Sequence, residues 1–245
     1  MSALVPFDHT FVLYDSSDLI SLAAAVWSLV PIFILVFYFS WFVCTREIEA
    51  VIVAAGHVAN DVVNSLVKNT LKQERPELVS ELAGFRVVGN GFNEFLGTQY
   101  GMPSAHSQFM GFFASYFILK LWLQWSRTEG KAPSQQMKVF GTLCLLFAAY
   151  CVCASRVYLF YHTLEQVAVG VSLGAFLGTS YFLLISFARA ISLVNWVVNW
   201  PFSSWLSVKD SWSEGGFTLE EERLQWLERC KRCKLETSES EKKGN

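Results

Sequence analysis

The sequence predicts an all-α membrane protein: a polytopic transmembrane helical bundle of about five spans with a further helix in the membrane interface. Two observations carry this prediction. Hydrophobic residues make up 53% of the 245 residues and charged residues only 16%, with a mean hydropathy of +0.34, and a soluble domain of this length cannot bury so much apolar surface. The apolar residues also gather into stretches close to the roughly 20 residues that cross a bilayer.

The first apolar stretch, residues 19–44, carries no charge. Asp8, Asp15 and Asp18 precede it without a basic stretch, so we do not expect a cleaved signal peptide. The other predicted spans are residues 50–67, 103–125, 139–155 and 162–188. Asp61 and Lys120 interrupt two of them, and charges at such depth usually face a protein interior or a wet cavity.

The part of the chain after the fifth predicted span divides into an interfacial segment and a tail. Residues 189–206 hold three tryptophans and Pro201, a pattern typical of a helix that lies in the interface. We therefore predict a membrane-embedded domain over residues 1–206 and a cytosolic tail over residues 207–245. The tail begins with a capping box formed by Thr218 and Glu221, which predicts a short helix, and it ends in a polar, disordered stretch.

Short basic loops predict the orientation. Arg127, Lys131 and Lys138 lie between the third and fourth spans, and five further basic residues lie between positions 223 and 234. Loops rich in lysine and arginine face the cytosol. The N-terminus, residues 68–102 and residues 156–161 then share the opposite side. The net charge of −2 offers no overall basic field, so we expect no nucleic-acid partner.

The first of three polar clusters on that non-cytosolic side is basic. Lys68 and Arg75 are seven residues apart, which predicts two cations on one face of a helix that ends before Pro76. Basic residues at a membrane border often only contact lipid headgroups, so this cluster alone is a weak signal.

The other two clusters each contain a histidine. Residues 103–106, Pro-Ser-Ala-His, open the third predicted span, where helix N-terminal amides can hold an anion. Ser155 and Arg156 precede His162, which opens the fifth span, and Gln166 lies one turn further on the same helical face. A single histidine in such a place is more often structural, but two of them beside several cations indicate a site.

Together these residue types form a cage for a phosphoryl group. Arginines can bind two oxygens at once, lysine adds a point charge, and serine and backbone amides supply neutral donors. Prepositioned donors of this kind stabilise a phosphoryl-transfer transition state. One imidazole can attack phosphorus while the other protonates the leaving oxygen. No carboxylate cluster accompanies the cations, so the sequence implies no metal and no cofactor.

The clusters resemble the three motifs of the type-2 phosphatidic acid phosphatase (PAP2) superfamily. Lys68, Arg75 and Pro76 match the first motif fully. The second motif is matched by Ser104 and His106, with Ala105 in place of glycine, and the third by Ser155, Arg156 and His162, with Gln166 in place of aspartate.

The resemblance implies a role for each matched residue. His162 is the nucleophile that forms a phosphohistidine, and His106 is the general acid. The phosphoryl group is held by five residues: Lys68, Arg75, Ser104, the Ala105 amide and Arg156. Residues 100–110 and 155–167 resemble more closely the branch of the superfamily that converts dolichyl diphosphate into dolichyl phosphate in the endoplasmic reticulum, where glutamine at the aspartate position is expected.

Other features of the sequence have two interpretations. His57, Asn60, Asp61 and Asn64 form a helical stripe that ends at Lys68. His57 and Asn60 are more simply explained by hydrogen bonds between helices, whereas Asp61 and Asn64 are candidates for positioning Lys68. Lys242-Lys243 resembles the dilysine signal of endoplasmic reticulum membrane proteins, or else is only a soluble end.

Two other functions stay open on the sequence alone. A phosphatase for phosphatidate or a sphingoid phosphate would use the same cage and bind the lipid differently. A transporter or scaffold without catalysis is the more distant alternative, and it leaves both motif histidines without a reason.

Overall fold

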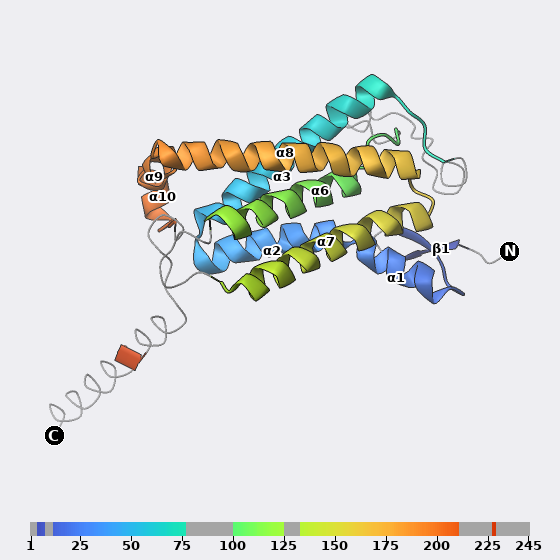
Figure 1. The fold of residues 1–245 in the computed structure, drawn as a ribbon, viewed down its shortest axis with the longest axis horizontal. Coiled ribbons are helices and arrows are strands. Elements are labelled where there is room, and N and C mark those ends of the chain that lie inside the picture. Colours follow the sequence, from blue (N-terminus) through green and yellow to red (C-terminus); the bar gives the residue numbers. More distant parts are fainter. Residues whose placement is uncertain (1–3, 8–11, 77–99, 125–132, 211–226, 229–245) are drawn as a thin grey trace.

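A computed structural model describes residues 4–7, 12–76, 100–124, 133–210 and 227–228. Long helices lie side by side in a bundle whose two ends carry different elements (Figure 1). The elements in chain order are β1 (Leu4–Phe7), β2 (Val12–Asp15), α1 (Leu19–Ser28), α2 (Val30–Thr45), α3 (Ile48–Leu71), α6 (Ala105–Leu119), the π-helix η2 (Lys120–Gln124), α7 (Gln135–Tyr158), α8 (Leu164–Ala190), α9 (Leu193–Val198) and α10 (Pro201–Trp205).

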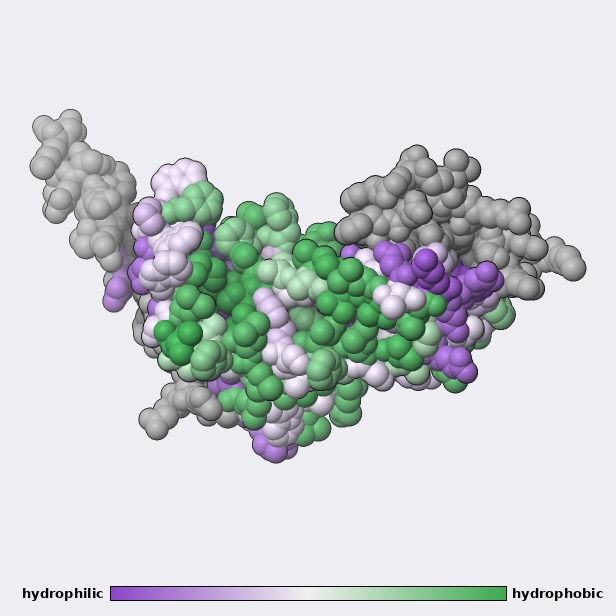
Figure 2. Space-filling model, turned by 90° about the horizontal axis from the view of Figure 1, so that it is seen from above, coloured by the Kyte–Doolittle hydropathy of each residue, from purple (hydrophilic) through white to green (hydrophobic). Residues whose placement is uncertain are grey.

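Four helical stretches within the described residues are long and apolar enough to cross a membrane: Leu19–Thr45, Ile48–Leu71, Gln135–Tyr158 and Leu164–Ala190. They correspond to four of the five predicted spans. The remaining one, α6, has 15 residues and continues directly into η2. It is the central helix, because α8, α7, α3 and α2 all pack against it. On the face that Figure 2 shows, mostly apolar residues lie between two more polar ends of the bundle.

The first span is divided at Leu29, where α1 ends and α2 begins. Pro31 explains this break, because proline has no backbone N–H to donate to the preceding turn. The sequence predicted one continuous helix here. Both segments still form a single apolar stretch of 27 residues.

Glycines set the close packing of α6 against α8. Gly170, Gly174 and Gly178 recur every fourth residue on the face of α8 that meets α6. A Cβ on Gly170 would lie 2.8 Å from the Ser104 carbonyl oxygen, and one on Gly174 would collide with the Gln108 backbone. Small residues at this spacing let membrane helices approach closely. The packing therefore fixes the start of α6, which carries His106.

An N-terminal β-hairpin was not predicted. β1 and β2 pair antiparallel with Val5 opposite Tyr14. Tyr14 packs with Val12 against a small cluster that contains Leu159 and Tyr161. The Tyr158 hydroxyl also donates to an Asp18 carboxylate oxygen at 2.6 Å. These contacts place the hairpin and α1 against the turn between α7 and α8.

The chain after α8 returns to the bundle. The segment predicted as one interfacial helix forms two short helices, α9 of 6 residues and α10 of 5 residues. Ser192 adopts a left-handed conformation between α8 and α9, and Pro201 begins α10. Lys209 then pairs with the turn before α3, donating its backbone N–H to the Arg46 carbonyl. The predicted capping box at Thr218 lies outside the described residues.

Candidate active site

One end of the bundle brings the predicted site residues together. The end of α3, the segment after it, the start of α6, the end of α7 and the start of α8 all meet there, opposite α9 and α10 (Figure 1). Three cations act electrostatically on both His106 and His162: Lys68, Arg75 and Arg156. Residues from all three motifs therefore lie near one another at this end of the bundle.

The prediction that Lys68 and Arg75 share a helical face was wrong. α3 ends at Leu71, and Lys72 turns the chain away in a left-handed conformation with φ of 49°. Arg75 and Pro76 belong to a non-helical segment, residues 72–76. Hydrogen bonds from distant residues hold this segment: Gly101 N–H donates to the Gln73 carbonyl at 2.7 Å, and the Gln166 amide donates to the Glu74 carbonyl at 2.9 Å.

The surroundings of His162 determine its tautomer. Its Nδ1 lies 2.9 Å from the Gly101 carbonyl oxygen and 3.2 Å from Gln166 Oε1. Both partners accept, because Gln166 Oε1 also receives the Thr163 backbone N–H at 3.3 Å. Nδ1 therefore carries the proton, and Nε2 keeps the lone pair that a nucleophile needs.

The protonation state of His162 agrees with that role. His162 is 4% exposed and lies outside the membrane-spanning helices. Burial lowers its pKa well below the usual value, and the charges of Arg75 and Arg156 lower that pKa further, while the Gln166 hydrogen bond raises it. The imidazole is therefore neutral near pH 7, which is the form that can attack phosphorus.

Two cations of the site, Lys68 and Arg156, are buried. Arg156 is 4% exposed, and its guanidinium lies over the Tyr161 ring, 4.1 Å from the ring centroid. Its Nε is buried without a hydrogen-bond partner. Within the described ranges neither Arg156 nor the buried Lys68 forms an ion pair. Burying a cation without a counter-charge is costly, and a bound anion would remove that cost.

The Pro-Ser-Ala-His motif opens α6 as predicted. Ser104 is the N-cap residue, and its side chain makes no capping bond. Its Oγ instead accepts from Ser107 at 3.0 Å, and its backbone N–H donates to the Gln166 carbonyl at 3.1 Å. Ala105 is the first residue of the helix, so its amide belongs to the N-terminal turn. His106 follows and lies beside the Ser28 backbone.

The predicted supporting residues lie in different places. Asn64 joins α3 to α6 through a 2.7 Å bond from its amide to Gln108 Oε1. Ser155 donates to Val152 of its own helix at 2.7 Å. Asp61 is exposed on α3, and its charge attracts that of Lys68. Asn64 thus orders the helices that carry Lys68 and His106, whereas Asp61 contributes through charge alone.

The helical stripe on α3 makes the helix-to-helix contacts that its simpler interpretation predicts. His57 Nε2 lies 3.3 Å from the Tyr38 hydroxyl of α2. Asn60 accepts from the Gln108 amide at 3.0 Å through its side chain and at 2.8 Å through its backbone carbonyl.

Sequence reasoning missed several residues that shape the site. Gln108 is fully buried between Asn60 and Asn64, but only its position two residues after His106 could have suggested it. Thr163 caps α8 in a reciprocal capping box with Gln166, a pattern readable as threonine followed three residues later by glutamine. Gly101 precedes the motif and carries no signal of its own.

Comparison with known proteins agrees with the three motifs. Residues 49–190 match the model of the PAP2 superfamily. The dolichyldiphosphatase of Saccharomyces cerevisiae is 43% identical over 218 residues, which cover 89% of this chain and 86% of the yeast protein. Dolichyldiphosphatase 1 of Homo sapiens is 32% identical over 84% of this chain and 82% of the human protein. No solved structure gives a significant match. The chain therefore belongs to the PAP2 superfamily and is a phosphatase homologous to the dolichyldiphosphatases.

Proposed function

We propose that this protein hydrolyses dolichyl diphosphate to dolichyl phosphate and inorganic phosphate. One observation supports the chemistry: a buried, neutral His162 whose Nε2 keeps its lone pair shares its site with Lys68 and Arg156, two buried cations that form no ion pair among the described residues. The substrate class comes from the dolichyldiphosphatase relatives, which align with most of the chain.

The proposed reaction has two steps. His162 Nε2 attacks the terminal phosphorus, and the bond from that phosphorus to the bridging oxygen breaks. His106, which the negative charge of the bound diphosphate keeps protonated, gives its proton to this oxygen. Dolichyl phosphate leaves, and a phosphohistidine remains. Water then attacks the phosphohistidine while His106 takes up the proton of the water, and phosphate is released. The phosphoryl oxygens are held by Lys68, Arg75, Ser104, the Ala105 amide and Arg156.

A diphosphate suits the neutral partners of His162. Gly101 and Gln166 accept the Nδ1 proton through neutral oxygens, so they stabilise the developing imidazolium less than a carboxylate would. The departing group of a diphosphate is a phosphate monoester, which is far less basic than the alkoxide released from a lipid monophosphate. We therefore expect the nucleophile to be strong enough for the phosphoanhydride and weak towards monophosphates.

The proposed location is the endoplasmic reticulum membrane, with the site in the lumen and the C-terminus in the cytosol. The basic loops and the Lys242-Lys243 pair support this orientation. Dolichyl phosphate made there would be reused as the lipid carrier for protein N-glycosylation. Cysteine tags near Asn90 should resist a membrane-impermeant reagent in intact microsomes, whereas tags after Glu236 should react. The reverse pattern would exclude this orientation.

Phosphate release by the purified protein in detergent tests the activity. Dolichyl diphosphate, phosphatidate and a sphingoid phosphate are compared with a chelator present, and His162→Ala serves as the inactive control. We expect the highest kcat/KM on dolichyl diphosphate and no dependence on divalent metal. Preference for either monophosphate would reassign the substrate, and unchanged phosphate release by His162→Ala would support a non-catalytic role.

A further inference from the structure

We propose that Gln166 is a positioning residue that ties the His162 helix to the Arg75 segment through its amide nitrogen, a role that a carboxylate could not fill. The proposal rests on the proposed function, because Arg75 is one of the cations assigned to the phosphoryl group. It adds a second task to Gln166, whose Oε1 already accepts from the His162 ring.

Two backbone groups fix the orientation of the Gln166 amide. Thr163 N–H can only donate, and it lies 3.3 Å from Oε1. The Glu74 carbonyl can only accept, and it lies 2.9 Å from Nε2. A flipped amide would set donor against donor and acceptor against acceptor. The oxygen of Gln166 therefore faces the nucleophile, and its nitrogen faces the Arg75 segment.

Four residues close a ring of hydrogen bonds around this amide. His162 Nδ1 donates to the Gly101 carbonyl and to Gln166 Oε1, at 2.9 and 3.2 Å. Gly101 N–H donates to the Gln73 carbonyl at 2.7 Å. Gln166 Nε2 completes the ring by donating to Gln73 Oε1 at 3.3 Å. The nucleophile and the segment before Arg75 are thus held by the same set of bonds.

Gln166 is closely packed against Gly101. Gln166 is 1% exposed, and a Cβ on Gly101 would lie 2.6 Å from its Nε2. A water molecule needs space and polar partners of its own. If the amide nitrogen were lost, the Glu74 carbonyl would lose this donor.

The Arg75 segment depends on such bonds because the helix does not extend to it. Lys72 ends α3 in a left-handed conformation, and Gln73, Glu74 and Arg75 are not helical. Their position is set by contacts with the start of α8 and with Gly101. A change at Gln166 Nε2 therefore reaches Arg75 and weakens the grip on the phosphoryl group.

Gln166→Glu isolates the nitrogen, because it keeps the side-chain length and one accepting oxygen but replaces the donor with an acceptor. The purified protein in detergent is titrated with inorganic phosphate, and kcat and KM for dolichyl diphosphate are measured alongside. We expect the phosphate Kd and the KM to rise about tenfold, because the Glu74 carbonyl loses its donor and the new carboxylate oxygen faces it instead. Phosphohistidine should still form.

Gln73→Glu is the matched control for the added charge. It places a carboxylate beside the Gln166 amide, where Gln73 Oε1 accepts at 3.3 Å, and leaves the Gln166 donor in place. We therefore expect its phosphate Kd within about twofold of the parent protein. In an Arg75→Ala background, Gln166→Glu should raise the Kd by less than about twofold, because residues that act through each other are not additive. Equal effects of the two glutamates, or a full effect without Arg75, would overturn the proposal.

Two further outcomes keep the test decisive. If Gln166→Glu does not fold, Gly101→Ala displaces the same amide, and an unchanged phosphate Kd in that variant would contradict the proposal. If the parent protein fails to hydrolyse dolichyl diphosphate while Gln166→Glu still weakens phosphate binding, the positioning role of Gln166 is supported and the proposed substrate is wrong. If the parent protein hydrolyses dolichyl diphosphate and Gln166→Glu leaves the phosphate Kd unchanged, the proposed substrate is supported and the positioning role of Gln166 is wrong.

Discussion

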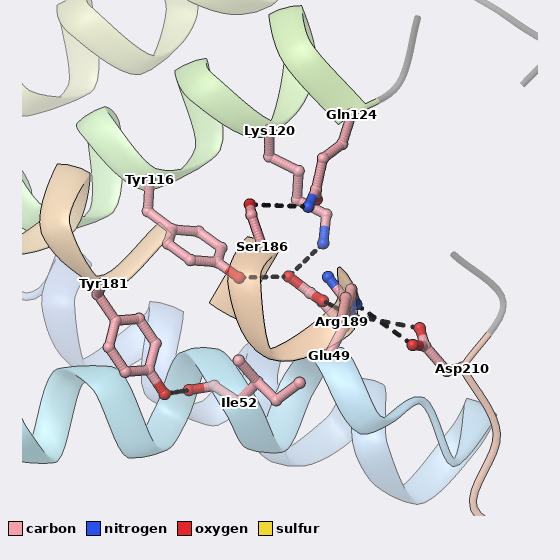
Figure 3. A network of polar contacts seen from close by, with 9 residues as sticks. All are labelled: Glu49, Ile52, Tyr116, Lys120, Gln124, Tyr181, Ser186, Arg189 and Asp210. Carbon is pink, nitrogen blue, oxygen red and sulfur yellow. Dashed lines mark hydrogen bonds and ion pairs between the residues drawn. The ribbon is translucent and has the colours of Figure 1, made fainter. Parts of the chain in front are cut away.

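Buried charges lie at both ends of this bundle, and the ion pairs found among the described residues lie at one of them. At the end near α9, the Glu49 carboxylate forms ion pairs with Lys120 and with Arg189, and it accepts from the Tyr116 hydroxyl at 2.8 Å (Figure 3). Arg189 also pairs with Asp210 at 3.3 Å. Two acids and two bases thus come together from α3, η2, α8 and the segment after α10.

At the opposite end, buried cations gather beside two histidines instead. Lys68 and Arg156 form no ion pair within the described ranges, and Arg156 Nε lacks a hydrogen-bond partner. The two ends therefore use buried charge in different ways. A cluster of paired acids and bases holds helices together. A cluster of buried cations alone costs free energy of folding until a ligand of opposite charge binds.

Arg156 should matter for catalysis more than for folding. Arg156→Ala removes a preorganised donor from the phosphoryl group, so kcat/KM for dolichyl diphosphate should fall by about 10²–10³-fold. The thermal unfolding midpoint in detergent should stay the same or rise, because a buried cation without a counter-charge is gone. A large fall in that midpoint would show that Arg156 is a structural residue.

Arg189 should show the reverse pattern. Arg189→Ala takes a partner from both Glu49 and Asp210, and breaking a buried pair costs about 3–5 kcal/mol. Thermal unfolding should report this loss, while kcat/KM per folded molecule stays unchanged. Arg46→Ala, which removes an exposed arginine at the same end, is the control. Equal destabilisation by both variants would contradict the role given to the Glu49 cluster.

The α6–α8 contact connects the two ends and should tolerate no added methyl group. Gly174→Ala forces a Cβ into the Gln108 backbone, so we expect a loss of about 1–3 kcal/mol in unfolding free energy together with lower activity. Gly141→Ala is the matched control, because its Cβ meets only the end of the flexible Leu121 side chain at 3.1 Å. Comparable losses in both variants would mean that helix propensity, not close packing, sets the effect.

The cations should also set the pH range of the reaction. His162 attacks only when neutral, and burial with Arg75 and Arg156 lowers its pKa well below the usual value. Activity should therefore persist as pH falls through about 6.5, the ordinary histidine pKa, and disappear only at lower pH. Below about pH 6.5 the unfolded chain binds the proton first, so His162 also makes stability fall with pH.

Arg75→Ala sharpens this prediction. Removing the charge should raise the His162 pKa and move the acidic limb of kcat/KM upward by about one pH unit. Because both proteins are measured with the same substrate, the titration of the substrate's phosphates affects both pH profiles equally. An acidic limb at the same pH in both would show that Arg75 does not act on His162.

The sequence could predict the site residues that helix ends and span order position. It could not predict those that contacts with distant parts of the chain hold in place. The three motifs placed His106, Arg156 and His162 at one end, because helix ends and span order fix their side of the membrane. The same reasoning failed for Arg75, since it assumed that the helix ran to Pro76. The left-handed Lys72 and the bonds from Gly101 and Gln166 that hold the next residues depend on partners far along the chain.

The ion-pair cluster around Glu49 was harder to predict from the sequence. Lys120 stood out as a charge inside a predicted span, but its partner Glu49 lies 71 residues away in the sequence and comes from another helix. Arg189, the second cation that pairs with Glu49, lies 69 residues from Lys120 on a third helix. The hairpin of β1 and β2 was missed because its two strands have only four residues each. The close contact of α6 and α8 could have been predicted from Gly170, Gly174 and Gly178, whose spacing is visible in the sequence.

The most direct test of the account is to find the phosphate on the enzyme. Dolichyl diphosphate labelled in its terminal phosphate is reacted briefly with the parent protein and with His106→Ala, and the quenched protein is mapped by mass spectrometry. The account predicts an acid-labile, base-stable phosphate on His162 and none in His162→Ala. A label on Ser104, or turnover without any label on histidine, would contradict it.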